Sequence, residues 1–254
     1  MTAGERSIVF CATQRTGSAV ITDDLSNLCG GRPFNSEFLY SELIRGEKHP
    51  PWDSVWKGAT RHCRFKGHVV SKVMFHYLPY LATAISGGTV GKTPPLYTFA
   101  PERVDAFYEF FRESTWVHIR RRDIFSQAVS MYFAEMTKLW EIRPWRIEQV
   151  PREQPWVPYD RARLMRYVQA FATENAGWRQ FFAHYDITPI QVDYEDAVDN
   201  YPAYLDGVLA TMRVKRTKAP DRRMIKLGNA TSARYANALR RDVMDHPILR
   251  SMVA

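Results

Sequence analysis

Residues suited to binding an anion follow the first apolar segment of the chain. The stretch from Ser7 to Leu25 reads SIVFCATQRTGSAVITDDL, so four apolar or small residues lead into a Thr-Gln-Arg-Thr-Gly-Ser turn. Helical spacing of apolar residues begins at Ala19, which predicts a strand, a tight loop and a helix N-terminus. Free N–H groups and the positive end of a helix dipole meet at such a junction. The loop around Arg15 is therefore predicted to bind an anion, although it lacks the Gly-Lys-Ser/Thr ending of an ATP-binding P-loop.

A second candidate anion site lies at three consecutive arginines, Arg120–Arg122. In WVHIRRRDIFSQAVSMYFA they end a predicted strand, and Asp123 can cap the helix that follows. Ser130 lies about two turns into that helix, where its hydroxyl and a guanidinium can bind one phosphate from two sides. Ligands of open α/β sheets bind at the carboxyl ends of the strands, so two such junctions indicate one ligand with two separated phosphate groups. A surface cluster of salt bridges is the alternative interpretation of the arginines.

The charge of the chain admits three kinds of partner. A net charge of +8 suits nucleic acid, an anionic membrane surface or a small polyanionic ligand. The densest basic segment, RVKRTKAPDRRMIK at Arg213–Lys226, carries seven Lys or Arg against one Asp. It is predicted to be a loop, either a solvated basic face or a flap over a phosphorylated ligand.

Other features exclude several classes of protein. The N-terminus has no secretory signal pattern, and the longest mostly apolar stretch, Val73–Ile85, is too short to span a bilayer, which predicts a soluble cytoplasmic protein. Cys11, Cys29 and Cys63 show no Cys-x-x-Cys spacing, so neither a disulfide scaffold nor a zinc site is expected. The stretch GGTVGKT at 87–93 ends like a P-loop, but two prolines replace the helix that should follow it.

The elements that must position these residues alternate between strand and helix. Strands are predicted at 7–13, 69–73, 115–120 and 188–192. Helical segments are predicted at 18–28, 37–45, 54–65, 75–85, 101–112, 123–139, 160–182, 201–212 and 232–245. This order predicts a single domain over residues 1–254, with an α/β fold of three α/β/α layers around a central, mostly parallel sheet.

Five motifs in this order resemble those of a known enzyme family. ATQRTGS after the first strand and RRRDIFSQAVS after a later one resemble the paired cofactor motifs of sulfotransferases that use 3′-phosphoadenosine 5′-phosphosulfate (PAPS). The chain is most similar to the bacterial trehalose 2-sulfotransferase family, which has a P-loop NTPase-like fold. Three further stretches agree with that family, namely GGRPFNSEF at Gly30–Phe38, GHVVSKVMF at Gly67–Phe75 and SARYANALRRD at Ser232–Asp242.

The resemblance implies a PAPS-dependent sulfotransferase that needs no metal, acts on a hydroxyl of a carbohydrate or glycolipid and forms a homodimer. The residues implied for the 5′-phosphosulfate are Gln14, Arg15, Thr16, Gly17 and Ser18, with Arg15 also catalytic. The residues implied for the 3′-phosphate are Ser130 with Arg121 or Arg122, and Arg223 and Lys226 of the basic segment would close over it.

The acceptor side requires a base, and the resemblance offers Glu37. A carboxylate with an ordinary pKa of about 4.3 can accept the proton late in the transfer. Lys72 can contact the acceptor or the sulfuryl oxygens, or it can be a strand-end lysine with its head group in water. Three histidines, His68, His76 and His118, are rival bases, and His118 is expected to lie in the core. Three tryptophans, Trp140, Trp145 and Trp156, can form a sugar-stacking wall, a dimer contact or part of the core.

Two other classes of function remain open on the sequence. A nucleotide or nucleoside kinase would prefer ATP with magnesium, and the phosphate loop argues against it. A noncatalytic nucleic-acid-binding protein would use the basic segment and would bind RNA or DNA with a steep salt dependence.

Overall fold

A mixed sheet forms the centre of the computed structural model. The model describes residues 7–29, 37–45, 50–92, 98–140, 156–219, 222, 224 and 228–253. The strands are β1 (Ser7–Ala12), β2 (Arg64–Phe65), β3 (His68–Met74), β4 (Thr115–Arg120) and β5 (Ile190–Asp193). Their order across the sheet is β2-β3-β1-β4-β5, and every pair is parallel except β2 with β3.

Strand β1 lies in the middle of the sheet, and all of its residues are buried. Val9 and Cys11 pack into one hydrophobic cluster, whereas Ile8, Phe10 and Ala12 pack into another. Parallel strands that are covered on both faces have continuous apolar sequences, which explains why β1 shows no alternation of polar and apolar residues.

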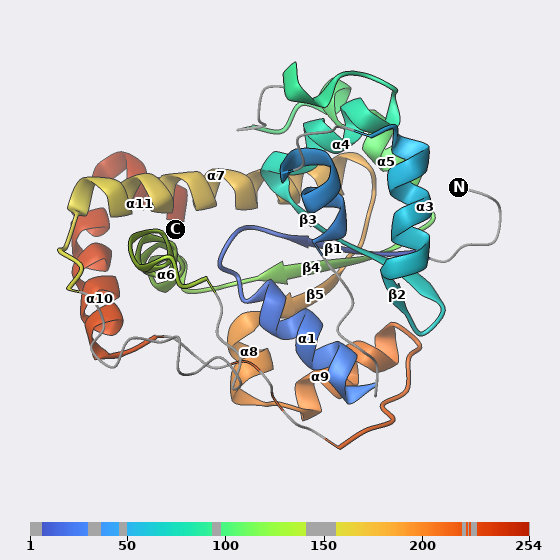
Figure 1. Cartoon of the computed structure of the whole chain (residues 1–254). Coiled ribbons are helices and arrows are strands. Elements are labelled where there is room, and N and C mark those ends of the chain that lie inside the picture. The colour runs from blue at the N-terminus through green and yellow to red at the C-terminus, as the bar shows by residue number, and fades with distance from the viewer. Residues whose placement is uncertain are drawn as a thin grey trace.

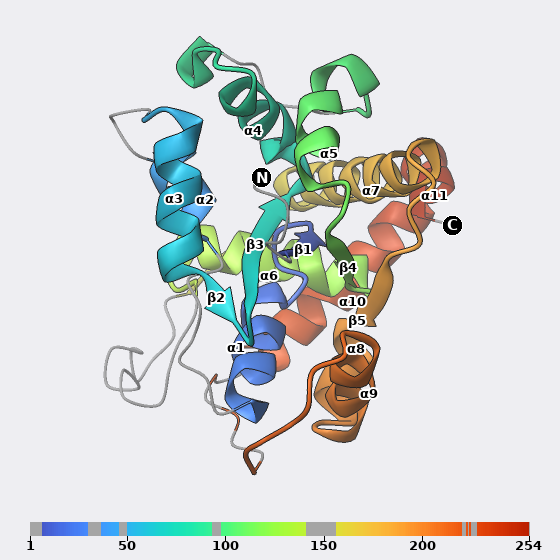
Figure 2. The ribbon, with the colours of Figure 1, turned by 90° about the vertical axis from the view of Figure 1, so that its right-hand side faces the viewer.

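Helices form the two outer layers and an additional bundle. The α-helices are α1 (Ser18–Leu28), α2 (Phe38–Tyr40), α3 (Trp52–His62), α4 (Leu78–Ile85), α5 (Asp105–Phe111), α6 (Ile124–Thr137), α7 (Arg161–His184), α8 (Tyr194–Asp199), α9 (Ala203–Thr211), α10 (Ala230–Met244) and α11 (Pro247–Val253). Helices α4 and α5 lie above the sheet in Figure 2, and α1 and α9 lie below it. Helices α6, α10 and α11 pack with the first half of α7 beside the sheet (Figure 1). The predicted three-layer α/β fold is therefore confirmed.

Several predicted boundaries were wrong, mainly where an element is short. The helix predicted at 54–65 is α3, which ends at His62, because the chain then turns into β2. The helical segment at 75–85 begins with a 3₁₀ turn at Phe75–Tyr77 before α4. Helices α8 and α11 were not predicted. The P-loop-like stretch contains a 3₁₀ turn at Val90–Lys92, and residues 93–97 lie outside the described part.

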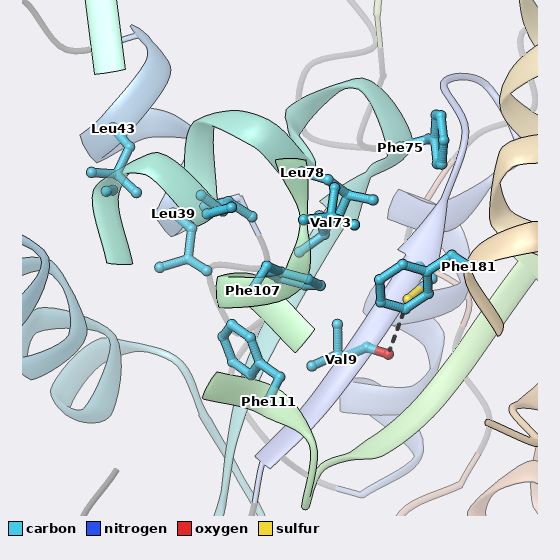
Figure 3. Close-up of a cluster of buried hydrophobic side chains, with 14 of the residues drawn as sticks. Val9, Leu39, Leu43, Val73, Phe75, Leu78, Phe107, Phe111 and Phe181 are labelled. Carbon is cyan, nitrogen blue, oxygen red and sulfur yellow. Dashed lines mark hydrogen bonds between the residues drawn. The ribbon is translucent and has the colours of Figure 1, made fainter. Parts of the chain in front are cut away.

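The larger hydrophobic cluster joins one face of the sheet to α3, α4, α5 and α7 (Figure 3). Trp178 on α7 is fully buried there, and its Nε1–H donates a hydrogen bond to the carbonyl oxygen of Ala12 at a distance of 2.9 Å. Buried indole N–H groups need such a partner. The bond fixes α7 against the end of β1, where the predicted anion-binding loop begins.

Two glycines within helices give a matched test of packing. A Cβ atom on Gly177 of α7 would lie 2.1 Å from Cζ of the buried Phe75, whereas a Cβ atom on Gly207 of α9 would have no atom within 4 Å. We expect Gly177→Ala to lower the free energy of unfolding by about 1–3 kcal/mol, because the core has no room for the methyl group. Gly207→Ala should raise it by up to about 1 kcal/mol through helix propensity. Urea unfolding measures both, and equal changes of one sign would contradict the packing.

Candidate functional site

The loop between β1 and α1 is held in a tight turn. Arg15 and Gly17 have positive φ angles of 62° and 78°, and Gly17 is the N-cap of α1. The buried Thr16 closes the turn, because its hydroxyl donates to the carbonyl oxygen of Thr13 at 2.9 Å. Since a glycine N-cap has no side chain to bond the first N–H groups of α1, these donors remain for another acceptor. Ser18 is the first residue of the helix.

Gln127 on α6 supports this loop from inside the protein. Its Nε2 donates to the hydroxyl of Thr13 at 2.8 Å and to the carbonyl oxygen of Gln14 at 2.6 Å, and the residue is fully buried. Gln127 was not among the site residues predicted from the sequence. The available signal was its position on the same helix face as Ser130, three residues away.

The structure brings two of the predicted cofactor residues into contact. The Nε of Arg15 donates a hydrogen bond to Oγ of Ser130 at 3.0 Å, and its Nη1 donates to the carbonyl oxygen of Trp140 at 2.7 Å. Arg15 comes from the loop after β1, whereas Ser130 comes from the helix after β4, and these strands are neighbours in the sheet. The two predicted anion sites therefore lie side by side at the carboxyl edge of the sheet, where α1, α6 and α8 begin (Figure 1).

The three consecutive arginines have different partners. Arg120 makes a two-pronged hydrogen-bonded pair with Asp193, at 3.0 and 2.9 Å, and Arg122 makes one with Asp196, at 2.8 and 2.7 Å. The hydrogen bonds from Arg122 lower the pKa of the Asp196 carboxyl. Arg121 instead donates from Nη1 to the carbonyl oxygen of Arg15 at 3.3 Å. The salt-bridge interpretation thus holds for two of the arginines, and the third lies against the loop between β1 and α1.

A charged pair borders the other side of the loop. Nζ of Lys72, on β3, lies 2.7 Å from Oε1 of Glu37; the lysine side chain is 3% exposed and the glutamate side chain 55%. Lys72 is therefore a buried lysine of the strand, with its ammonium group directed at the predicted base. The rings of Tyr40 and Tyr77 stack beside this pair with centroids 4.6 Å apart. Burial and the nearby Tyr40 raise the pKa of Tyr77, whose side chain also hydrogen-bonds to Gln14.

The histidines predicted as rival bases have distinct environments. Nδ1 of His76 lies 3.0 Å from Oε1 of Glu174, and the His76 ring contacts the ring of Tyr77. His118 lies in the core against Phe182, as expected, and burial followed by the charge of Arg120 lowers its pKa to about 3. Burial thus favours the neutral imidazole of His118.

Part of the predicted basic flap runs along α1. The N–H groups of Thr217 and Lys218 both donate to the carbonyl oxygen of Leu28, and Arg222 pairs with the buried Asp24 at 2.8 Å. Three residues of the prediction, Arg223, Lys226 and Trp145, lie outside the described residues. Trp140 and Trp156 are exposed, so the core interpretation is wrong for these two.

Two kinds of feature are absent from the described residues. Among the described helices, none has the length together with the hydropathy that a bilayer crossing requires. The same residues contain no group of three or more His, Cys, Asp or Glu side chains arranged to hold a metal ion.

Comparison with known proteins identifies the family. The sequence pattern of the family described as Stf0 sulphotransferase matches residues 86–242, which is more than half of the chain and includes the arginine triplet and Ser130. The chain therefore belongs to the Stf0 sulphotransferase family. The matched region begins after the loop with Arg15 and after Glu37.

Two individual relatives are similar to about half of this chain. Trehalose 2-sulfotransferase of Mycolicibacterium smegmatis is 27% identical over 126 residues, and that of Mycobacterium tuberculosis is 27% identical over 128 residues. Each match covers 50% of this chain, and 45% and 46% of the relatives, so it spans about half of their length. A sulfotransferase structure from Alicyclobacillus acidocaldarius matches 99% of this chain and 96% of its own, with a TM-score of 0.48 and 14% identity.

Proposed function

We propose that the protein transfers a sulfuryl group from PAPS to a hydroxyl group of a carbohydrate acceptor. The observation that carries the proposal is the hydrogen bond between Arg15 and Ser130, since it joins two strand-to-helix anion sites into one. A nucleotide with phosphate groups at both its 3′ and 5′ positions suits such a site. Membership of the Stf0 sulphotransferase family supports the same donor chemistry.

The side chains present fit this co-substrate. The first N–H groups of α1 have no side-chain acceptor from their N-cap, and the guanidinium of Arg15 lies at the same loop. Nε of Arg121 is buried and has no hydrogen-bond partner among the described residues, which is a costly arrangement unless an anion completes it. Gln14 to Ser18 would hold the 5′-phosphosulfate, and Ser130 with an arginine of the triplet would hold the 3′-phosphate.

The reaction would be an in-line displacement at sulfur. When bound, PAPS supplies the sulfuryl group; the bond from sulfur to the bridging oxygen breaks while a bond forms from the acceptor oxygen. Arg15 and the loop N–H groups would stabilise the charge that develops on the departing 5′-phosphate. Glu37 would take the proton of the acceptor hydroxyl, which leaves a sulfate ester and adenosine 3′,5′-bisphosphate.

A carbohydrate suits the other side of the loop. The stacked rings of Tyr40 and Tyr77 can pack against the apolar face of a sugar, and Lys72 beside Glu37 can bind its hydroxyl or the sulfuryl oxygens. The names of the relatives from the two mycobacteria support a trehalose-like disaccharide. A single catalytic domain over residues 1–254 and a homodimer stay predictions, and light scattering of the purified protein tests the latter.

Thermal unfolding with small nucleotides tests the proposal. We expect adenosine 3′,5′-bisphosphate to raise the unfolding temperature more than AMP or ATP with magnesium at equal concentration. A ligand that binds only the native state adds about 2.7 kcal/mol at one hundred times its dissociation constant. Replacing Ser130 with alanine should remove most of the gain, because one of the two anion contacts is lost.

Other outcomes would favour the other classes of function. A shift with ATP and magnesium alone would contradict the sulfotransferase and support a kinase. Indifference to all three nucleotides, together with salt-sensitive binding of RNA or DNA, would support a nucleic-acid-binding protein.

A further inference from the structure

The segment Asp193–Asp196 docks onto the arginine triplet residue by residue. Asp193 is the register partner of Arg120 in the parallel pair of β4 and β5, and their side chains are hydrogen-bonded. The carboxylate of Glu195 accepts hydrogen bonds from the backbone N–H groups of Arg122 and Asp123, at 3.1 and 3.2 Å. Asp196 then pairs with the side chain of Arg122. Three of the four residues in this segment are thus acids that bind residues 120–123. The fourth is Tyr194.

Arg121 is the arginine that faces this tyrosine. Its guanidinium carbon lies 4.8 Å from the centroid of the Tyr194 ring, within the range of a cation–π interaction. A ring face attracts the cation but accepts no directed hydrogen bond as strong as one to a carboxylate. The Nε atom of Arg121 is buried without a hydrogen-bond partner among the described residues. The guanidinium of Arg121 therefore keeps N–H donors for an anion, whereas the guanidinium groups of Arg120 and Arg122 each bind a carboxylate.

Tyr194 also contacts the anion-binding loop directly. A Cβ atom built on Gly17 would lie 2.2 Å from Cδ2 of Tyr194, so the ring packs on the α-carbon of this glycine. Gly17 has a φ of 78° and is the N-cap of α1. One aromatic ring thus touches both the turn that aims the helix N–H groups and the arginine that lies beside it.

We propose that Tyr194 is a positioning residue of the cofactor site and that Arg121, rather than Arg122, is the arginine of the triplet that binds a phosphate of PAPS. The inference rests on the proposed function and adds to it the choice of arginine and the residue that holds it. Tyr194 orients the Arg121 guanidinium and fixes the Gly17 turn. Arg122 secures α8 to the end of β4.

Calorimetric titration of the full chain with three nucleotides tests the inference. The nucleotides are adenosine 3′,5′-bisphosphate, adenosine 3′-monophosphate and AMP. We expect Arg121→Met and Tyr194→Leu each to weaken bisphosphate binding about tenfold or more, the effect of losing a charged contact or its orientation. The same two variants should lose discrimination between the bisphosphate and one of the monophosphates. Tyr194→Phe keeps the ring and should bind like the wild type. Arg122→Met should weaken binding less than Arg121→Met does, because it loses the pair with Asp196 but no contact to the nucleotide.

A double variant separates positioning from a general loss of structure. If Tyr194 acts through Arg121, Tyr194→Leu combined with Arg121→Met should bind no more weakly than Arg121→Met alone. If the loss of bisphosphate affinity in the double variant equals the product of the losses in the two single variants, the positioning role is overturned. Weak binding by Arg122→Met with normal binding by Arg121→Met would overturn the choice of arginine.

The proposed function fails in a different way. If the wild type itself shows no preference for the bisphosphate, the sulfotransferase proposal is wrong. If the wild type binds the bisphosphate and Tyr194→Leu, still folded by its unfolding temperature, binds it equally well, only this inference is wrong. Should Tyr194→Leu fail to fold, Arg121→Met still tests the guanidinium, and weak binding by Tyr194→Phe would show that the hydroxyl rather than the ring matters.

Discussion

Replacing Glu37 with glutamine is expected to lower PAPS turnover with trehalose by about 10²- to 10⁴-fold, the usual contribution of a general base. Glutamine keeps the shape of the side chain, and its amide oxygen can still accept the hydrogen bond from Lys72 that Oε1 of Glu37 accepts at 2.7 Å. The substitution thus removes the proton acceptor without leaving the buried ammonium group unpaired. Turnover is measured as adenosine 3′,5′-bisphosphate released over time, and the binding of this product should not change.

The control for Glu37 is another acid of the same segment. Glu42 is exposed in the π-helical turn Ser41–Arg45, so Glu42→Gln should turn over like the wild type. The rival base is His76, which is paired with Glu174. Normal turnover by Glu37→Gln, together with a loss in His76→Gln, would reassign the proton acceptor to the histidine and leave the sulfotransferase proposal in force.

Replacing Arg15 with alanine should lower PAPS turnover by about 10²- to 10³-fold and remove most of the stabilisation by adenosine 3′,5′-bisphosphate. A charged donor aimed at the oxygen where charge develops contributes this much in comparable sites. Arg15 links the loop to Ser130 and to the carbonyl oxygen of Trp140, so its loss also frees the two halves of the site from each other. Arg15→Lys keeps the charge but lacks the paired N–H donors of the planar guanidinium, so it should recover only part of the activity.

The control for Arg15 must account for its backbone. Arg15 has a φ of 62°, and Lys66, an exposed basic residue in the turn between β2 and β3, has a φ of 47°. Lys66→Ala therefore removes a basic side chain from a similar left-handed position and should leave turnover unchanged. Equal losses in both variants would show that backbone strain, rather than the guanidinium, causes the effect.

The elements around the candidate site could be predicted from the sequence where the signals are local. The strand at β1, the turn with Arg15 and Gly17, and the start of α1 follow one another within a few residues, so hydrophobic spacing and turn residues suffice. The same holds for β4 and for Asp123, whose side chain accepts a hydrogen bond from the N–H of Ser126 as the N-cap of α6. Short elements such as β2 and α8 contain too few residues to show a period.

The partners of the arginines could not be predicted in this way. Arg120 and Asp193 are 73 positions apart in sequence, and His76 and Glu174 are 98 apart. Charge alone does not say which acid meets which base. Which arginine meets an acid and which meets Tyr194 depends on the register of β4 with β5, and this register exists only in the folded sheet.

The docking of Asp193–Asp196 onto the arginine triplet has a consequence for protein engineering. The contacts depend on one register, because Asp193 is paired with Arg120 in the sheet and both Glu195 and Asp196 then contact Arg122. Inserting or deleting a single residue after β5 would leave Asp193 opposite Arg120 but would displace Glu195 and Asp196 from their partners. A chimaera that exchanges β4 and its arginines between relatives must therefore exchange β5 and the first turn of α8 as well, and the two segments, far apart in the chain, act as one transferable unit.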